Sequence, residues 1–290
     1  MLWHPLQSVV ARQWMVVTIF FVVLCLLQPR NLEASQVIHV PVYQYHNWEP
    51  FYFKDNKGHQ GFSVVFVEQL NDFFRKQRPD LKIHFTLKPM DRPDLNALLK
   101  EGRQGLVLWA NELWFKRLFD RPYFSATSPI YWDNDAIISL AKTPVEYVEP
   151  KSLVGLHLGG LKGHYYHGVD QLVSLGKIKR TDVDNDRINL QRLLDGKINA
   201  MVITQTVFNY AKPDYPDSIF YQSFVPQDTY SRHILMTPGY SHLSELLNFY
   251  ISSLPHNEEW TDVLTAYGLD DLIVPFTLDL NELNNFSIEE

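Results

Sequence analysis

The pattern of apolar and polar positions divides the first part of the chain into alternating strands and helices. Runs of apolar and β-branched residues predict buried strands at residues 37–43, 82–87 and 106–110. Apolar positions spaced three or four apart predict helices at residues 64–76 and 93–100. This β-α-β-α-β order is typical of a parallel sheet covered by helices.

A second series follows a long apolar stretch at residues 130–140. That stretch contains no Gly or Pro, and it predicts a strand that crosses into another part of the molecule. A later apolar strand at residues 233–237 predicts the return crossing. The other expected elements are strands at 154–158, 198–203 and 218–224, a glycine-rich turn at 159–163, and helices at 164–175, 188–194, 204–210, 241–254 and 256–267.

We therefore predict an α/β protein of two lobes, each a β-sheet flanked by helices, with a discontinuous first lobe. Residues 35–130 form the first part of lobe 1, residues 131–232 form lobe 2, and residues 233–290 return to lobe 1 and end in an acidic tail. Two crossings place a cleft between the lobes at the carboxyl ends of the strands, where open α/β sheets bind ligands. They also supply a hinge, which couples ligand binding to closure.

The N-terminal segment has the pattern of a secretory signal peptide. Residues 15–27 are apolar except for one threonine, which is short for a membrane span of about 20 residues but fits the apolar core of a signal. Leu24 stands before Cys25, whereas a lipidated cysteine follows a small residue. We expect a non-lipidated signal peptide at residues 1–34, cleaved near Ala34, and export to the periplasm. An uncleaved N-terminal anchor is the alternative.

Composition and charge narrow the functional classes. The 290-residue chain has 26 Lys and Arg, 33 Asp and Glu, and a net charge of −7 at pH 7. It has no basic run, so nucleic-acid binding is not expected. Its single cysteine, Cys25, falls in the signal segment, which leaves the exported chain no thiol for a disulfide or a metal site.

Two local patterns offer only weak metal sites. His164 and His167 share a helical spacing, but such a pair is unremarkable in a chain with 11 histidines. Residues 182–186 alternate aspartates without the glycine and the bidentate glutamate of a calcium loop. The sequence contains no nucleophile elbow, Walker loop or HExxH motif. We expect no metal, no cofactor and no catalytic residue.

Short blocks of glycine, proline, aromatic and charged residues follow one another in a fixed order. They are Trp48-Glu49-Pro50-Phe51, Gly58, Gly61-Phe62, Leu98 through Ala110, Lys116-Arg117, Phe124-Ser125 through Pro129, Gly155 through Gly163, and Leu193 through Ala200. In this order they resemble the bacterial extracellular solute-binding proteins of family 3, the polar amino-acid-binding class of ABC importers. The resemblance covers nearly all of the chain after the signal segment.

The resemblance implies the two-lobed periplasmic-binding-protein fold and three ligand-binding residues. Arg117 stands near the family's carboxylate-binding Arg, and a planar guanidinium matches a carboxylate through two hydrogen bonds. A surface pair with Asp120 or Glu112 is the alternative for this arginine. Trp48 stands where the family stacks an aromatic ring on the ligand. Thr204 falls at or next to the Asp that receives a ligand's ammonium, so the ammonium end of the usual site differs here.

The remaining candidates follow from their positions in predicted elements. Trp109 and Asn111 end a strand at the predicted cleft. Glu112 is a candidate acceptor for a ligand cation, or a carboxylate favoured by a helix dipole. Three further candidates begin the predicted helix after the glycine-rich turn, where free backbone N–H groups bind anions. These are Gly163, His164 and Tyr165.

We therefore expect a periplasmic solute-binding protein that captures a small polar, carboxylate-bearing ligand in the interlobe cleft for an ABC importer. The expected partners are that ligand and the membrane importer subunits, and the chain is expected to be a monomer. Two alternatives stay open. One is a sensory protein whose closed form docks on a membrane receptor. The other is an enzyme similar to prephenate or arogenate dehydratases, in which Glu112 or His164 acts as an acid.

Overall fold

The computed structural model describes residues 37–119 and 122–272. The predicted signal peptide at residues 1–34 and most of the acidic tail lie outside the described residues. Every helix and strand described belongs to one compact unit, which begins at Ile38. Within it, none of the described helices has the length and apolar character that crossing a membrane requires.

The first sheet group is a parallel sheet with helices packed against it. β1 (Ile38–Gln44) lies between β4 (Ile83–Pro89) and β5 (Leu106–Ala110), and all three run parallel. α2 (Phe62–Gln77) and α3 (Arg92–Lys100) contribute apolar side chains to the cores that cover this sheet. The predicted order of strands and helices in this part of the chain is confirmed.

The second sheet group repeats this arrangement. β8 (His157–Leu161) lies between β9 (Lys179–Val183) and β10 (Ala200–Thr204), again in parallel. Its helices are α4 (Val169–Ser174), α5 (Asp186–Leu194) and α6 (Gln205–Ala211). Both groups together confirm the predicted α/β class.

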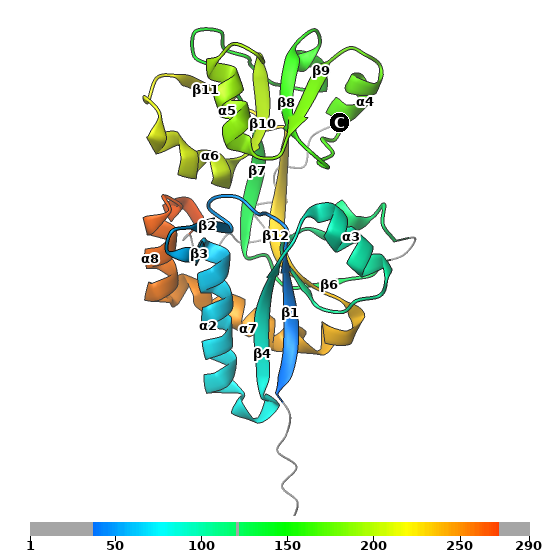
Figure 1. Cartoon of the computed structure of the whole chain (residues 1–290), viewed down its shortest axis with the longest axis vertical. Helices are drawn as coiled ribbons and strands as arrows, with labels where there is room; N and C mark the ends of the chain where they lie inside the picture. Colours follow the sequence, from blue (N-terminus) through cyan, green and yellow to red (C-terminus); the bar gives the residue numbers. More distant parts are fainter. Residues whose placement is uncertain (1–36, 120–121, 273–290) are drawn as a thin grey trace, which may run out of the picture. The chain divides into compact units, whose positions relative to one another are not determined.

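Two long strands, β7 (Tyr131–Leu140) and β12 (Asp228–Met236), join the two sheet groups (Figure 1). β12 pairs antiparallel with β7 over residues 228–232 and with β5 and β6 (Ser125–Ala126) over residues 233–236. The resulting path is β4-β1-β5-β12-β7-β10-β8-β9, with β11 (Phe220–Gln222) added beside β7. The exact lobe boundaries, after residues 130 and 232, remain a prediction.

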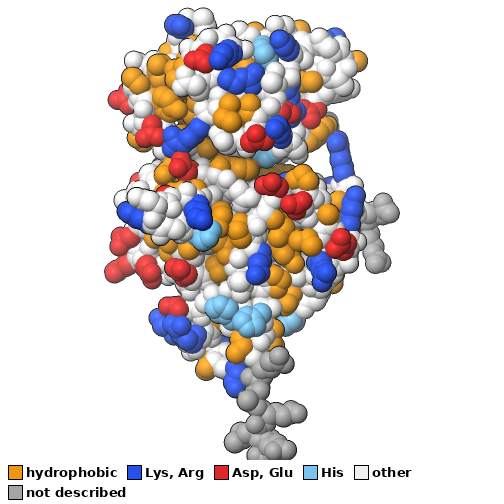
Figure 2. All heavy atoms as spheres, in the orientation of Figure 1, with side chains coloured by type: hydrophobic (Ala, Val, Ile, Leu, Met, Phe, Trp, Pro, Cys, Tyr) orange, Lys and Arg blue, Asp and Glu red, His pale blue; other side chains and the backbone are white. Residues whose placement is uncertain are grey.

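Short elements and two further helices complete the described part. They are β2 (Phe53–Asp55), β3 (Gly58–Gln60), α7 (Ser244–Ser253), α8 (Glu258–Ala266), and the 3-10 helices η1 (Pro79–Leu81), η2 (Glu112–Phe115), η3 (Pro150–Leu153), η4 (Lys212–Asp214), η5 (Pro238–Leu243), η6 (Leu254–His256) and η7 (Asp270–Leu272). On the face shown in Figure 2, acidic and basic side chains are interspersed.

The glycine-rich turn predicted at residues 159–163 is wrong in its first part, because Gly159 and Gly160 lie inside β8 and the turn begins after Leu161. A Cβ atom on Gly159 would lie 2.7 Å from Asn189 Oδ1 and 2.7 Å from Ile198 Cδ1. Close packing of α5 and its neighbours against the strand therefore requires glycine at this position.

The helix predicted to start at residue 164 begins five residues later, at Val169. Gly168, with φ of +72°, stands before its first turn, a backbone conformation that favours glycine. Gly163, His164 and Tyr165 consequently lie in the turn between β8 and α4. They do not form the helix N-terminus that the sequence pattern predicted.

Candidate functional site

A buried ion pair lies where β7 and β12 run side by side. In β7, Tyr131, Asp133 and Asp135 are on one face, because alternate residues of a strand point the same way. Arg232 of β12 places its Nε 2.7 Å from Asp133 Oδ2, and each of these two side chains is 1% exposed. Such a pair is tolerated only when its remaining polar atoms also find partners.

The Arg232 guanidinium has partners in the first sheet group. Its Nη1 donates to the backbone oxygen of Trp109 (2.9 Å) and lies 3.2 Å from His46 Nε2. Because arginine can only donate, His46 Nε2 must accept, which leaves the imidazole neutral with its proton on Nδ1. Burial and then the Arg232 cation lower the pKa of His46 well below its ordinary range, in agreement with this tautomer. The guanidinium carbon also lies 4.9 Å from the centre of the Phe51 ring.

Asp133 is satisfied as completely as its partner. Besides Arg232, its carboxylate accepts from Thr206 Oγ1 (2.9 Å), from the Thr206 backbone N–H (3.3 Å) and from the Asn134 backbone N–H (3.0 Å). Thr206 lies in the first turn of α6. The pair therefore ties β7, β12, β5 and α6 together, and we interpret it as a structural joint.

Asp135 lies on the same face of β7, and no cation in the described part of the chain forms a hydrogen bond with it. Tyr230 donates its hydroxyl to Asp135 at 2.8 Å, and the Thr204 hydroxyl lies 3.3 Å away. Burial raises the pKa of Asp135 to about 6, against the opposing effect of the Tyr230 hydrogen bond. Thr204, predicted as a ligand-binding residue, thus belongs to a buried acidic cluster.

An open pocket of about 220 Å³ lies between the loop after β1 and the start of α5. Trp48 and Glu49 line it from the first sheet group, and Asp186, Arg187 and Tyr210 line it from the second. The Trp48 indole N–H is buried and has no hydrogen-bond partner in the described part of the chain. This wall of the pocket therefore carries a buried donor that has no acceptor among the described residues.

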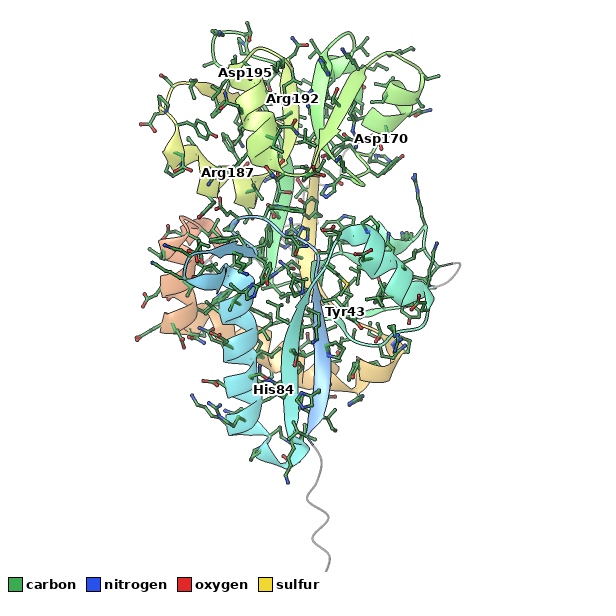
Figure 3. The ribbon with its side chains drawn as sticks, in the orientation of Figure 1. Tyr43, His84, Asp170, Arg187, Arg192 and Asp195 are labelled. Carbon is green, nitrogen blue, oxygen red and sulfur yellow. The ribbon has the colours of Figure 1, made fainter. Side chains whose placement is uncertain are left out.

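Arg187 connects the two walls at the edge of this pocket. Its guanidinium lies 2.6 Å from Glu49 Oε2 and 2.8 Å from Asp214 Oδ2. Figure 3 shows Arg187 on the side of the second sheet group that faces β2 and β3. The arginine side chain is 44% exposed, and exposed ion pairs contribute only about 0–1 kcal/mol. The Arg187–Glu49 ion pair is therefore weak, so it can form and break as the two walls approach and separate.

Asp186 comes directly before Arg187 in the sequence, but it is buried and unpaired among the described residues, whereas Arg187 is exposed and paired. Asp186 is 2% exposed, and neither carboxylate oxygen has a hydrogen-bond partner within the described ranges. Burial and then the Asp135 carboxylate raise the pKa of Asp186 well above its ordinary range. A buried polar group without a partner costs about 1–3 kcal/mol. Asp186 therefore brings to the pocket lining a buried acceptor that lacks a donor among the described residues.

Four of the predicted site residues meet across the two sheet groups. The rings of Trp48 and His164 have centres 6.1 Å apart, and the Arg117 guanidinium carbon lies 4.0 Å from the centre of the Tyr165 ring. Burial, followed by nearby arginine cations, lowers the pKa of His164 to about 4, so this imidazole is neutral at neutral pH. The sequence prediction therefore identified residues that face one another, although from a turn and not from a helix start.

Three other predicted residues have structural partners or lie elsewhere. Trp109 is fully buried, with φ of +57°, and its indole N–H donates to Ser63 Oγ at 2.7 Å. Asn111 accepts from the backbone N–H of Leu113 and so caps η2. Glu112 is exposed and lines a separate pocket in the first sheet group. Their part in ligand binding, like that of Gly163, remains a prediction.

Sequence reasoning did not single out the residues of the buried clusters. These are His46, Asp133, Asp135, Asp186 and Arg232. A signal was available for three of them: Asp133 and Asp135 are carboxylates on either side of Asn134 in the predicted crossing strand, and Arg232 comes directly before the return strand. Of the residues in the structure's described ranges, no three or more His, Cys, Asp or Glu gather in a way that could hold a metal ion.

Comparisons with known proteins identify the fold. The sequence matches no established family and no curated protein. Three solved structures illustrate the likeness. The first is an ancestral arginine-binding protein bound to arginine, with 19% identity over 79% of this chain and 97% of that chain, and a TM-score of 0.58. The second is the ancestral amino-acid-binding protein AncCDT-1, a precursor of cyclohexadienyl dehydratase, with 14% identity over 79% of this chain and 95% of that chain, and a TM-score of 0.60. The third is the substrate-binding protein of an amino acid ABC transporter, with 15% identity over 79% of this chain and 98% of that chain, and a TM-score of 0.57.

At these identities the likeness shows the fold alone. The chain has the two-lobed periplasmic-binding-protein fold, and the predicted fold class is confirmed. The two sheet groups correspond to its lobes, and the pocket beside Trp48 has walls from both of them.

Proposed function

We propose that this chain is an extracytoplasmic solute-binding protein that holds a small amino-acid-like ligand between its lobes. The observation that carries the proposal is the pocket of about 220 Å³ whose walls come from both lobes. It combines a buried donor without an acceptor, Trp48 Nε1, with a buried acceptor without a donor, the Asp186 carboxylate. A bridging ligand satisfies both groups only when the lobes are together.

The physical consequence is ligand-dependent closure. A ligand shifts an equilibrium between open and closed forms by the difference in its affinity for the two forms. Contacts to Trp48 on one lobe and Asp186 on the other exist together only in the closed form, so they favour closure. The exposed pair between Arg187 and Glu49 adds a weak contact of the same kind. The satisfied pair of Asp133 and Arg232 keeps the connecting strands in place.

The solved proteins of this fold support an amino-acid-like ligand. One is bound to arginine, one is an amino-acid-binding protein and one serves an amino acid ABC transporter. We extend this to location and partners. The predicted signal peptide directs the chain to the periplasm, and the closed form delivers its ligand to a membrane importer.

A binding assay with matched tryptophan variants tests the proposal. A thermal-shift screen of the common amino acids comes first, because a ligand that binds only the folded state stabilises it, by about 2.7 kcal/mol at 100 times Kd. Trp48→Ala is expected to weaken the best ligand at least tenfold. Trp132→Ala, an exposed tryptophan of β7 (49% exposed), serves as the control and is expected to leave affinity unchanged.

Two results would count against this assignment. One is the absence of any stabilising amino acid in the screen, together with no small molecule in native mass spectrometry of the purified protein. The other is equal loss of affinity in both tryptophan variants. Uptake of the ligand by cells lacking this chain tests the importer separately: unchanged uptake would favour a receptor as the membrane partner.

A further inference from the structure

The carboxylate of Asp186 differs from the other buried acid groups of the site. Asp133 has Arg232 and three further donors, and Asp135 has the Tyr230 hydroxyl. Asp186 is as deeply buried, yet neither of its oxygens receives a hydrogen bond in the described part of the molecule. Asp186 also belongs to the lining of the pocket whose walls come from both lobes.

The charges around the pocket leave this carboxylate uncompensated. Arg187 is the cation of the pocket lining, and it already pairs with two carboxylates, Glu49 and Asp214. An ionised Asp186 therefore adds a negative charge that Arg187 does not neutralise, because Arg187 is already paired with two other carboxylates. An anionic ligand group placed there would increase the repulsion, whereas a cationic group would remove it.

Aromatic residues on both walls also suit a cation. Trp48 lines the pocket from the first lobe, opposite Asp186, and Tyr210 lines it from α6 of the second lobe. The face of an aromatic ring attracts ammonium and guanidinium groups, by about 0.5–2 kcal/mol depending on exposure. A carboxylate facing aromatic rings is an arrangement that binds a small organic cation. The volume of about 220 Å³ is smaller than the roughly 300–1,000 Å³ of pockets for drug-sized ligands.

We infer that Asp186 binds the positively charged group of the ligand, so that the cleft selects a small organic cation of the basic amino-acid class. This inference rests on the proposed solute-binding function and adds the ligand's charge to it. A guanidinium or primary ammonium supplies the donors that both Asp186 oxygens lack, and its charge balances the carboxylate.

Pairs of ligands that differ in charge but little in shape test the inference. Calorimetric titration compares arginine with citrulline and lysine with norleucine. The unaltered protein is expected to bind each cationic member at least tenfold more tightly than its neutral partner. Asp186→Asn is expected to abolish this preference. Asp184→Asn is the matched control, because Asp184 is an exposed carboxylate two residues earlier that pairs with Lys162 at 2.8 Å.

The outcomes separate the inference from the proposed function. If citrulline and norleucine bind as tightly as arginine and lysine, or if Asp186→Asn keeps the preference, the cation site is overturned while solute binding stands. If no member of either pair binds, and no other amino acid does, both are overturned. Asp186→Ser is a second neutral variant, and a cooperative thermal transition in each variant ensures that lost preference is not lost folding.

Discussion

Two aspartates of this protein are equally buried and have opposite surroundings. Asp133, on β7, receives hydrogen bonds from Arg232, Thr206 and Asn134 and is 4% exposed. Asp186, at the start of α5, is 2% exposed and receives none within the described residues. Both lie near the junction of the two lobes, so burial alone does not explain the difference.

The difference separates a structural carboxylate from one that awaits a partner. A buried ion pair with every atom satisfied fixes the arrangement of the strands that carry it, but adds little net stability over an apolar replacement. A buried carboxylate with no donor costs stability, and a folded protein retains it where another molecule supplies the donors. The comparison thus assigns Asp133 to the joint between the lobes and Asp186 to the ligand.

The largest expected effect follows from breaking the satisfied pair. Asp133→Ala leaves the Arg232 guanidinium buried without its counter-charge, and the free energy of unfolding is expected to fall by about 3–5 kcal/mol. Urea denaturation monitored by tryptophan fluorescence measures this. Asp72→Ala, in an exposed pair with Arg75, is the control, with an expected loss of about 0–1 kcal/mol.

The double variant Asp133→Leu with Arg232→Met sharpens the interpretation. It removes both charges, so most of the lost stability is expected to return. A double variant as unstable as Asp133→Ala would mean that the hydrogen bonds to Thr206 and Trp109, and not the ion pair, determine the stability of the joint.

The second expected effect is an increase in the free energy of unfolding, in contrast to the decrease expected for Asp133→Ala. Asp186→Asn removes a carboxyl group whose folded-state pKa is raised, chiefly by burial. A group with a raised folded pKa contributes stability below its ordinary pKa of about 3.8 that is lost as the pH rises through the folded value. The variant is therefore expected to exceed the unaltered protein by about 1–3 kcal/mol at pH 8 without ligand, and to equal it near pH 4.

Unfolding curves at several pH values between 4 and 8 measure this crossover. A ligand-free Asp186→Asn protein that is less stable than the unaltered protein at pH 8 would contradict the comparison, because Asp186 would then have structural partners after all. The Asp184→Asn control removes only an exposed pair with Lys162, and its free energy of unfolding is expected to stay within about 1 kcal/mol of the unaltered protein.

The sequence predicted the lobes better than the site, and particular residues explain why. Hydrophobic periodicity reports which segments are buried, and it identified both connecting strands, β7 and β12. It missed β9, because the strand's sequence Lys-Arg-Thr-Asp-Val has few apolar positions. Ion pairs of Arg180 with Asp170 and Asp182 anchor this strand, and hydrophobic periodicity does not detect ion pairs. It also misassigned Gly159, because a glycine required by side-chain packing has the same sequence signal as one in a turn.

The site depends on distances that a sequence does not contain. Trp48, Arg117, His164 and Tyr165 were predicted as ligand-binding residues. They contact one another in two pairs across the lobes, and their role in binding remains a prediction. No sequence pattern distinguishes Asp186 from Asp184, its exposed neighbour. Only the fold decides that one carboxylate points to solvent and pairs with Lys162, while the other is buried without a donor.

The smallest expected effect concerns Arg117, which makes an exposed contact between the lobes. Its guanidinium covers the ring of Tyr165 at 4.0 Å, and both residues are exposed. An exposed contact of this kind contributes about 0.5–1 kcal/mol, which corresponds to a change in affinity of roughly two- to fivefold. Arg117→Ala is therefore expected to weaken ligand binding by that factor, through a less stable closed form. Tyr165→Ala is expected to weaken binding by the same factor, and the double variant is expected to lose no more affinity than either single variant. Calorimetric titration measures these affinities.

A loss of a hundredfold in Arg117→Ala alone would instead mean that this arginine binds the ligand's carboxylate directly. In that case Asp186 and Arg117 would hold the two ends of a zwitterion, and the ligand would have to span both.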